Sequence, residues 1–581
     1  MEEARRAGIL VLGPNMVGLT YVPNHLNAVF WPVIDVEGPL AVVGQSGSVT
    51  IDLAERAARD GVGISAMVNL GNQADLCETD VLDFLSTDEA TAAIALYLEG
   101  LRDGRRFLEV AARVSREKPV VVLKAGRSPS GRRAVASHTA SLAGDHVVFD
   151  HACRERGILT APDLDSLYDM AKGCALVRRP RGPRVFCLSS SGGAAALVAD
   201  EAERLGLQLP QPSTAMVHEL EQLDLSPRAS LSNPLDLGYS ATDSVAAEFE
   251  RAVGVVHAAG IADTVVFCFA DPIPGGAQLV ERFAASSGLT VVVAYFAGGT
   301  LQLEDGVRMQ RARVPVYPTP ERALRVVAAL AQGAAGGDAV AASRERRPDA
   351  SPSGVHGQVL SWLPEPDAIS LVEDAGVPFA PWRFARTLED VVGAADGLGY
   401  PVVLKVVSPQ VLHKSAAGGV VCGIANATAL RVALPAMRDA VARSVPDARI
   451  VGYLVMAEVP AGPELMVGTR RDATFGPVVT FGLGGTMVEM IADVAMRLVP
   501  CSREQARAMV GETRAFRLLA AYQQGGASIE ALIDVILATS RFMEHRPEVE
   551  QLDINPLRLQ EGRLLALDAR VGVRQGEVVI E

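Results

Sequence analysis

Short apolar runs alternate, from about Pro39 onward, with stretches whose apolar positions recur at helical spacing. Continuous apolar strands between amphipathic helices predict a parallel sheet with helices on both faces, because both faces of each strand must be buried. The first run has candidate strands at Leu40–Val43, Ile64–Leu70, Ala93–Leu98 and Pro119–Lys124, and helices at Thr50–Asp60 and Arg105–Arg116. The pattern restarts with strands at Arg184–Leu188, Thr264–Phe269 and Thr290–Tyr295. The fold class predicted for this part is α/β, with two successive parallel sheets.

The two runs also correspond in their first loop and helix. The segment Val43–Ser48 can be laid on Leu188–Gly193, and the same offset of 145 residues places Gly61 on Gly206. A loop, a helix length and a glycine that all match at one offset favour duplication over chance likeness. We therefore predict two tandem flavodoxin-like units, each opening with a strand, a loop and a helix.

A Gly-, Ala-, Ser-, Pro- and Arg-rich stretch near 333–352 has the composition of a linker, and the rhythm changes after it. The later candidate strands are Pro401–Val407, Ile450–Val459 and Pro477–Phe481, and the helices are Arg503–Val510 and Ser528–Met543. Gln551–Leu557 and Arg563–Ala569 are predicted to form a closing antiparallel pair. This order is typical of an α+β nucleotide-grasping domain.

Composition narrows the possible partners. The 581 residues suffice for several domains, and at 49% hydrophobic content each can bury a core. A net charge of −14 argues against partners such as nucleic acid or an anionic membrane. The seven cysteines are scattered without a CxxC pair, which argues against a zinc knuckle or disulfide framework and favours a reducing cytoplasm. No apolar run is long enough to span a bilayer.

The amino-terminal residues have the pattern of an incomplete domain. Met1–Arg6 is typical of the end of a helix, and Gly8–Leu12 is predicted to be the strand that follows it. A domain that begins there would lack its first strands.

Two loops set serine and glycine between a buried strand and a helix. Small residues let backbone N–H groups approach an anion, and a helix N-terminus favours negative charge. Each loop alone also fits an ordinary strand-to-helix turn. As a pair flanking a histidine loop, they predict a phosphate-binding site made by Gln45, Ser46, Gly47, Ser191, Gly192 and Gly193.

Two histidines lie in turn-forming segments far apart in the chain. His138 follows the basic run Lys124–Arg133, and His413 lies after an apolar strand of the nucleotide-grasping region. Glu99 is at the carboxyl end of a predicted strand, where α/β sheets place functional groups. It could bond one imidazole nitrogen and leave the other nucleophilic. Each of these residues could instead simply be solvated, but together they suggest a phosphoryl relay with His138, Glu99 and His413 as catalytic residues.

The last region carries candidate ligands of a nucleotide. Lys405 ends an apolar strand, and a buried lysine needs a partner such as phosphate. Glu458 and Glu464 flank a proline-glycine turn and fit contacts to adenine or ribose. Asn555 and Asp568 place oxygen atoms on adjacent strands, as Mg²⁺ bound to a nucleotide requires.

These motifs, in this order, resemble those of the ADP-forming acetate–CoA ligases, which are nucleoside-diphosphate-forming acyl-CoA synthetases related to succinyl-CoA synthetase with fused subunits. The resemblance covers essentially the whole chain. It rests on Gly13-Pro14-Asn15, Gln45-Ser46-Gly47, Leu70-Gly71-Asn72, Tyr97-Leu98-Glu99-Gly100, Lys124-Ala125-Gly126, Ser137-His138-Thr139, Asn233-Pro234-Leu235-Asp236, His413-Lys414 with Gly418-Gly419-Val420, and Asp553-Ile554-Asn555-Pro556.

The resemblance implies a reaction. Acyl-CoA, ADP and phosphate would interconvert with carboxylic acid, ATP and CoA through an acyl phosphate and a phosphohistidine at His138. Glu99 would orient that histidine, the loops at Ser46 and Ser191 would cradle the phosphoryl group, and His413 would be a second carrier. Mg²⁺ would be the cofactor. Relatives carry glycine where Ala140 stands and usually an acidic residue near 416, so loop mobility and the role of His413 are expected to differ here.

The resemblance also implies a domain plan and partners. The plan is 1–36 as the remnant of a CoA-binding Rossmann-like domain, 37–180 as the first flavodoxin-like domain with the phosphohistidine loop, 181–332 as the second, 333–363 as a linker, and 364–581 as an ATP-grasp domain. Relatives self-associate, so a homo-oligomer is expected, and a separate chain could supply the CoA-binding domain.

Two alternatives stay open from the sequence. One is a catalytically weakened ligase-like protein that binds nucleotide or acyl-CoA and regulates a partner. The other is an ATP-grasp ligase that works without a histidine relay. The sequence selects neither the acyl group nor ATP over GTP.

Overall fold

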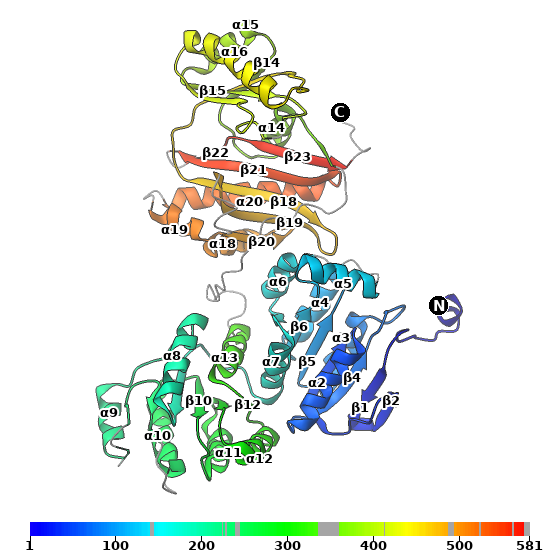
Figure 1. The fold of residues 1–581 in the computed structure, drawn as a ribbon, viewed down its shortest axis with the longest axis vertical. Coiled ribbons are helices and arrows are strands. Elements are labelled where there is room, and N and C mark those ends of the chain that lie inside the picture. The colour runs from blue at the N-terminus through cyan, green and yellow to red at the C-terminus, as the bar shows by residue number, and fades with distance from the viewer. Residues whose placement is uncertain are drawn as a thin grey trace. The chain divides into compact units, whose positions relative to one another are not determined.

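The computed structural model describes residues 1–139, 145–223, 225–226, 229–238, 245–334, 360–411, 413–485, 493–521, 525–560 and 563–574. The chain forms two compact units, Met1–Glu345 and Arg346–Glu581 (Figure 1). The predicted linker lies largely outside the described residues.

The first unit contains a seven-stranded sheet in the order β2-β1-β4-β3-β5-β6-β7. Its strands are β1 (Gly18–Tyr21), β2 (Leu26–Val29), β3 (Glu37–Gly44), β4 (Ile64–Asn69), β5 (Ala93–Leu98), β6 (Val120–Lys124) and β7 (Leu159–Thr160). Strands β3 to β7 are parallel, as the continuous apolar runs predict. The hairpin β1–β2 adds to the edge by antiparallel pairing with β4 and was not predicted.

Helices connect these strands in order. They are α2 (Gly47–Arg59), α3 (Glu78–Thr87), α4 (Gly104–Ser115), α5 (Pro129–Thr139), α6 (His146–Glu155) and α7 (Leu164–Leu176), with α1 (Glu2–Arg6) at the amino terminus. Helix α1 agrees with the predicted end of a helix.

The strand predicted at Gly8–Leu12 is wrong. This segment bonds to the loop after β4 instead of to a strand, since the amides of Asn72, Ala74 and Leu76 donate to carbonyls of residues 14, 13 and 11. The approach is close, because a Cβ on Gly71 would lie 2.2 Å from the carbonyl oxygen of Pro14.

A five-stranded parallel sheet follows in the order β12-β11-β10-β8-β9. Its strands are β8 (Val185–Ser189), β9 (Leu235–Asp236), β10 (Thr264–Phe269), β11 (Thr290–Tyr295) and β12 (Val316–Tyr317). Its helices are α8 (Gly192–Leu205), α9 (Thr214–Glu221), α10 (Val245–Ala259), α11 (Gly276–Ser287), α12 (Gly299–Arg311) and α13 (Pro320–Ala334).

The predicted correspondence between the two parallel sheets is confirmed at the loops. Ser46 precedes α2 and Ser191 precedes α8 as N-cap residues, 145 positions apart. Gly61 and Gly206, at the same offset, both have positive φ, +79° and +69°. The two tandem flavodoxin-like units therefore begin alike.

The two sheets share one hydrophobic core, which joins α7 to α8 and α13. Buried polar contacts cross the same junction. Lys172 donates to the carbonyl of Val316 at 2.8 Å, and the guanidinium of Arg322 donates to the carboxylate of Asp169. The second flavodoxin-like unit is thus held firmly against the first.

The unit Arg346–Glu581 is built on two antiparallel sheets. One has the order β13-β23-β21-β18-β19-β20 with β22 paired to β21, and the other β14-β17-β15-β16. The strands are β13 (Leu360–Trp362), β14 (Trp382–Ala385), β15 (Val402–Val407), β16 (Val420–Ile424), β17 (Gly452–Ala457), β18 (Glu464–Asp472), β19 (Gly476–Leu483), β20 (Val494–Leu498), β21 (Val549–Gln560), β22 (Arg563–Ala566) and β23 (Ala569–Arg574).

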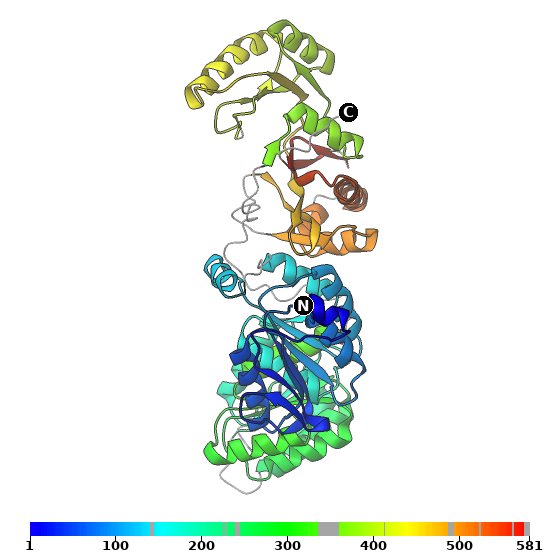
Figure 2. The ribbon, with the colours of Figure 1, turned by 90° about the vertical axis from the view of Figure 1, so that its right-hand side faces the viewer.

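The helices of this unit pack on the faces of its two sheets. Helices α15 (Leu388–Leu398) and α16 (Ala427–Ser444) pack together on one face of the four-stranded sheet (Figure 2). Helix α20 (Gly525–His545) packs on β18 and β19, beside α18 (Arg503–Gly511) and α19 (Arg514–Ala521). Helix α14 (Glu365–Asp374) follows β13 and packs on β23.

One predicted strand is divided. Arg563–Ala569 forms β22 and the first residue of β23, with Leu567 and Asp568 between them. The backbone leaves the ladder there, because the Leu567 amide donates to the Pro556 carbonyl and its carbonyl accepts from Lys405. The break places the carboxylate of Asp568 beside Lys405. No helix in the described part of the chain has the length and apolar character needed to cross a membrane.

Candidate functional site

Two equivalent helix N-termini in the first unit form one candidate site. Ser46 and Ser191 are both extended at the N-cap, and neither side chain accepts a capping hydrogen bond from its helix. Their first-turn N–H groups are therefore available to an anion, which such a terminus favours. Glycine is favoured beside Ser191, since a Cβ on Gly192 would lie 2.9 Å from Asp236 Oδ2, which would have to move.

Glycine is also favoured in the first loop. A Cβ on Gly47 would lie 2.5 Å from Val17 Cγ2. Gly193 has more room, because its Cβ would meet only Ser191 Oγ, at 3.8 Å. The phosphate-binding role of these loops stays a prediction.

The Gln45 side chain is buried and fully engaged inside the fold. Its Oε1 accepts from the amides of Glu99 at 2.5 Å and Gly100 at 3.0 Å. Its Nε2 donates to the Gly100 carbonyl at 2.8 Å and to Gln73 Oε1 at 3.0 Å. Both amide hydrogens are used, and the Gln45 backbone N–H donates to the Tyr97 carbonyl at 3.2 Å, so Gln45 holds the strand-end loop and keeps no unused donor for an anion.

A buried polar chain continues from Gln45. Gln73, a non-glycine residue at φ +52°, donates to Glu78 Oε2 at 2.6 Å. Burial is the largest influence on the Glu78 carboxyl group and raises its pKa. Backbone strain held by buried hydrogen bonds is typical of functional loops.

Glu99 lies at the carboxyl end of β5, as predicted, and is buried with 5% exposure. Lys124 donates to its carbonyl at 2.8 Å. Burial lowers the pKa of Lys124 to about 8, although the Glu99 carboxylate opposes that shift. Burial, together with the same carboxylate, raises the pKa of Tyr97 to about 12. The Glu99 side chain is thus buried close to a lysine and a tyrosine.

The backbone of His138 lies in the last turn of α5, which follows β6 in the same unit. Its side chain, and residues 140–144 with Ala140, lie outside the described residues. The contact between His138 and Glu99 therefore stays a prediction.

The unit Arg346–Glu581 has a candidate site of its own, a buried cluster of charges. Lys405 donates to Glu365 Oε1 at 2.8 Å and to the Leu567 carbonyl at 2.5 Å, and its Nζ lies 4.0 Å from Asp568 Oδ2. Lys414 Nζ lies 2.5 Å from Glu365 Oε2. Lys405 and Asp568 were predicted, whereas Glu365 and Lys414 were missed as members of the site.

Burial and charge oppose each other within the cluster. Burial disfavours the ionised form of Glu365, but Lys405 and Lys414 outweigh it and hold its pKa below the usual range. Burial likewise disfavours charged Lys405, but Glu365 and Asp568 raise its pKa overall. Burial, with Glu365 nearby, raises the pKa of Asp568.

Oxygen atoms suited to a hard cation lie next to this cluster. Ile554 pairs with Ala569, so Asn555 and Asp568 lie opposite each other just beyond that pair. Asp568 Oδ1 is buried without a hydrogen-bond partner among the described residues, whereas Asn555 Oδ1 accepts from the Gly485 amide at 2.9 Å. Within the described ranges no group of three or more His, Cys, Asp or Glu residues could enclose a metal ion. Two oxygens plus phosphate fit Mg²⁺, which keeps few protein ligands.

Other predicted residues are more tightly engaged. Glu464 forms an ion pair with Arg558, and Glu458 accepts from the Gly423 amide at 2.9 Å. His413 is exposed and directly precedes Lys414. The structure brings Lys405 and Asp568 together, and it gives Glu458 and Glu464 separate partners.

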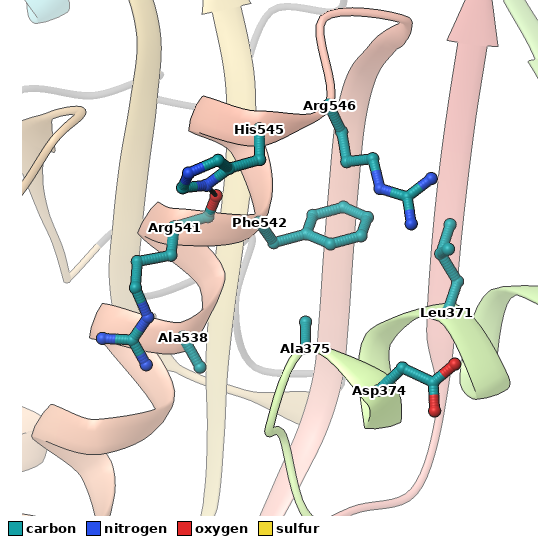
Figure 3. A pocket seen from close by; sticks show the side chains of 8 residues that line it. All are labelled: Leu371, Asp374, Ala375, Ala538, Arg541, Phe542, His545 and Arg546. Atoms are coloured by element: carbon teal, nitrogen blue, oxygen red, sulfur yellow. Dashed lines mark hydrogen bonds between the residues drawn. The ribbon is translucent and has the colours of Figure 1, made fainter.

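A hollow of 230 Å³ elsewhere in this unit does not coincide with the site. It lies between α14 and α20, where Phe542 faces Leu371 and Ala375 between the side chains of Arg541 and Arg546 (Figure 3). It contains none of the predicted site residues.

The chain has two flavodoxin-like units, each with a candidate anion-binding turn, and then a nucleotide-grasping unit with a buried lysine. This combination defines a class of ligases that couple a nucleotide to an acyl or phosphoryl intermediate. The succinyl-CoA ligase-like flavodoxin domain family matches residues 37–174, and the ATP-grasp domain family matches residues 355–573.

Known proteins narrow this class. The chain is 33% identical over 585 residues to acetate–CoA ligase [ADP-forming] I of Archaeoglobus fulgidus, covering 98% of this chain and 83% of that protein. It is 28% identical over 604 residues to 4-hydroxybutyrate–CoA ligase [ADP-forming] of Nitrosopumilus maritimus, covering 99% and 84%. A solved acetyl-coenzyme A synthetase of Ca. Korarchaeum cryptofilum, in complex with phosphate and ADP, has a TM-score of 0.53 and 33% identity, covering 58% of this chain and 73% of that one.

The chain therefore belongs to the family of ADP-forming acyl-CoA ligases typified by acetate–CoA ligase, and it is an acid–thiol ligase. The predicted family, fold class and enzyme class are confirmed. The predicted domain boundaries stay predictions, and β1 and β2 lie in the same sheet as β3 to β7.

Proposed function

We propose that this ligase interconverts acyl-CoA, ADP and phosphate with carboxylic acid, ATP and CoA through an acyl phosphate and a phosphohistidine at His138. The observation that carries this proposal is the pair of uncapped helix N-termini at Ser46 and Ser191, in equivalent positions of two units that share one core. Two such termini can hold a phosphoryl group from two sides. A regulatory protein without catalysis, or an ATP-grasp ligase without a relay, leaves this duplication unexplained.

The proposed reaction has three steps. A phosphate oxygen attacks the thioester carbonyl, the carbon–sulfur bond breaks, and the CoA sulfur leaves and takes up a proton. An imidazole nitrogen of His138 then attacks phosphorus, and the carboxylate leaves. The β-phosphate oxygen of ADP finally takes the phosphoryl group, which frees the histidine. Relay protects the acyl phosphate, because each transfer occurs away from water.

The residues divide these tasks. The carboxylate of Glu99, whose backbone amide is held by Gln45, would accept from one imidazole nitrogen of His138 and leave the other nucleophilic. The first-turn backbone N–H groups that follow Ser46 and Ser191 would bind the phosphoryl oxygens. His413 is proposed as a second carrier, since it is exposed beside the lysine cluster.

The nucleotide is proposed to bind at the buried cluster. Lys405 would contact its phosphates, Glu458 and Glu464 would contact its base or ribose, and Asn555 and Asp568 would hold Mg²⁺. When bound, Mg²⁺ supplies charge neutralisation for the phosphate oxygens. Relatives named for acetate, 4-hydroxybutyrate and trans-ferulate show that acyl groups vary among similar proteins, so the acyl group here remains to be measured.

The partners and the location of the enzyme are proposed from its relatives and from its cysteines. Similar ligases exist as separate α and β subunits in Pyrococcus furiosus, so a partner chain or self-association fits this architecture. A cytoplasmic location fits the seven unpaired cysteines.

The direct test is a panel of carboxylic acids incubated with the full chain, ATP, CoA and Mg²⁺, with ADP, AMP and acyl-CoA measured. We expect ADP and acyl-CoA in equal amounts, with loss of activity on chelation of Mg²⁺. Release of AMP would contradict the proposed reaction, because an acyl-adenylate would then be the intermediate.

A further inference from the structure

A single buried carboxylate joins two lysines from different segments of the ATP-grasp region. Glu365, in the first turn of α14, lies 2.8 Å from Lys405 Nζ through one oxygen and 2.5 Å from Lys414 Nζ through the other. Its side chain is 3% exposed. Lys405 lies on β15 and Lys414 in the loop before β16, so the carboxylate fixes one segment against the other.

The remaining contacts leave one side of this cluster for a ligand. Two donors of Lys405 are used by Glu365 and the Leu567 carbonyl, and Asp568 is 4.0 Å away. Among the described residues, Glu365 is the ion-pair partner found for Lys414. Asp568 is 26% exposed, more than Glu365, so the cluster meets solvent on the Asp568 side. Anionic phosphate can therefore approach both lysines while Glu365 holds them from behind.

We propose that Glu365 is the positioning residue of the nucleotide-phosphate site, which holds Lys405 and Lys414 so that both are directed at the same phosphates. This inference rests on the proposed nucleotide site. Glu365 touches no substrate in this scheme and acts through the two lysines. It also fixes the residue that follows His413, so nucleotide binding and the position of His413 are coupled through one carboxylate.

The test is calorimetric titration of the full chain with MgADP. Glu365→Gln keeps the shape and removes the charge. We expect its affinity for MgADP to be about ten- to a hundredfold weaker than that of the wild type, the range for one lost charged hydrogen bond. Asp367→Asn removes a charge from the exposed side of the same helix turn and should bind like the wild type.

A second variant covers the case in which Glu365→Gln does not fold, since two buried cations would lose their partner. Glu365→Asp keeps the charge on a shorter side chain, so it should bind MgADP more tightly than Glu365→Gln and more weakly than the wild type. Folded variants that bind MgADP within twofold of the wild type would overturn the role of Glu365 alone. A wild type that fails to bind MgADP would reject the proposed nucleotide site itself.

Discussion

Replacing Gln45 by leucine is the sharpest single perturbation of the candidate site in the first unit. The Gln45 amide makes four hydrogen bonds to buried groups around the end of β5, at 2.5 to 3.0 Å. Leucine has similar size and none of these groups. The amides of Glu99 and Gly100 then lose their shared acceptor, Gln45 Oε1, in a site that water does not reach.

The magnitude follows from these two amides. A buried donor left without a partner costs about 1–3 kcal/mol, so the pair lowers the free energy of local opening by about 2–6 kcal/mol. This corresponds to exchange of the two amide hydrogens that is about thirtyfold to ten-thousandfold faster. Ligase turnover should also fall in Gln45→Leu, because the Glu99 backbone is no longer fixed.

The assay is hydrogen exchange of the peptide that covers Leu98–Leu101, together with turnover of the full chain. Gln211→Leu is the matched control, since Gln211 also bonds a loop backbone, by donating to the Asn233 carbonyl at 2.8 Å and accepting from its amide at 3.1 Å. It should loosen its own loop and leave turnover unchanged. Unchanged exchange at residues 99 and 100 in Gln45→Leu would refute the structural role of this side chain.

Three further predictions concern pH and backbone geometry. Burial holds the pKa of Lys124 at about 8 against an ordinary 10.5, so the folded state releases this proton at lower pH than the unfolded state does. Between these pH values the wild type should therefore gain about 3 kcal/mol of stability relative to Lys124→Met. A stability difference in thermal unfolding that does not change with pH would contradict this. Burial raises the pKa of Asp553 to about 6 from 3.8, so the folded state keeps this proton to higher pH than the unfolded state does. As pH rises through this window, the wild type should lose about 3 kcal/mol of stability relative to Asp553→Asn. Melting temperatures of the two proteins that change equally with pH would count against this. Gly71→Ala should cost about 1–3 kcal/mol of stability, because φ is +54° and the new Cβ meets the Pro14 carbonyl oxygen at 2.2 Å. The control Gly8→Ala, at φ +68° with open space around it, should cost less. Equal losses of stability in thermal unfolding would show that the contact with Pro14 is unimportant.

Strands that are buried on both faces were the easiest elements to predict. Ala93–Leu98, Thr264–Phe269 and Thr290–Tyr295 match β5, β10 and β11 end to end, because a central parallel strand must be apolar throughout. The short hairpin at Gly18–Val29 was missed, since the four residues of β1 alternate in burial and the edge strand β2 is exposed, so neither shows such a run.

The candidate site was predictable where chemistry is local. A serine and glycine turn between a buried strand and a helix identifies an anion-binding terminus, and a lysine in an apolar strand identifies a need for negative charge. The role of Gln45 was not predictable, because its partners lie more than fifty residues away, at Glu99 and Gly100. Glu365 resembles an ordinary first-turn acid of a helix, and only the fold brings it to Lys405, forty residues away in sequence.

The measurement that tests the central claim most directly is labelling of the full chain with γ-³²P-ATP and Mg²⁺, followed by peptide mapping. The proposed relay predicts an acid-labile phosphoryl group on the peptide that contains His138. The label should disappear when carboxylic acid and CoA are added, and the His138→Ala variant should not carry it at that peptide. Undiminished turnover in His138→Ala, with no label on the His138 peptide of the wild type, would contradict the relay.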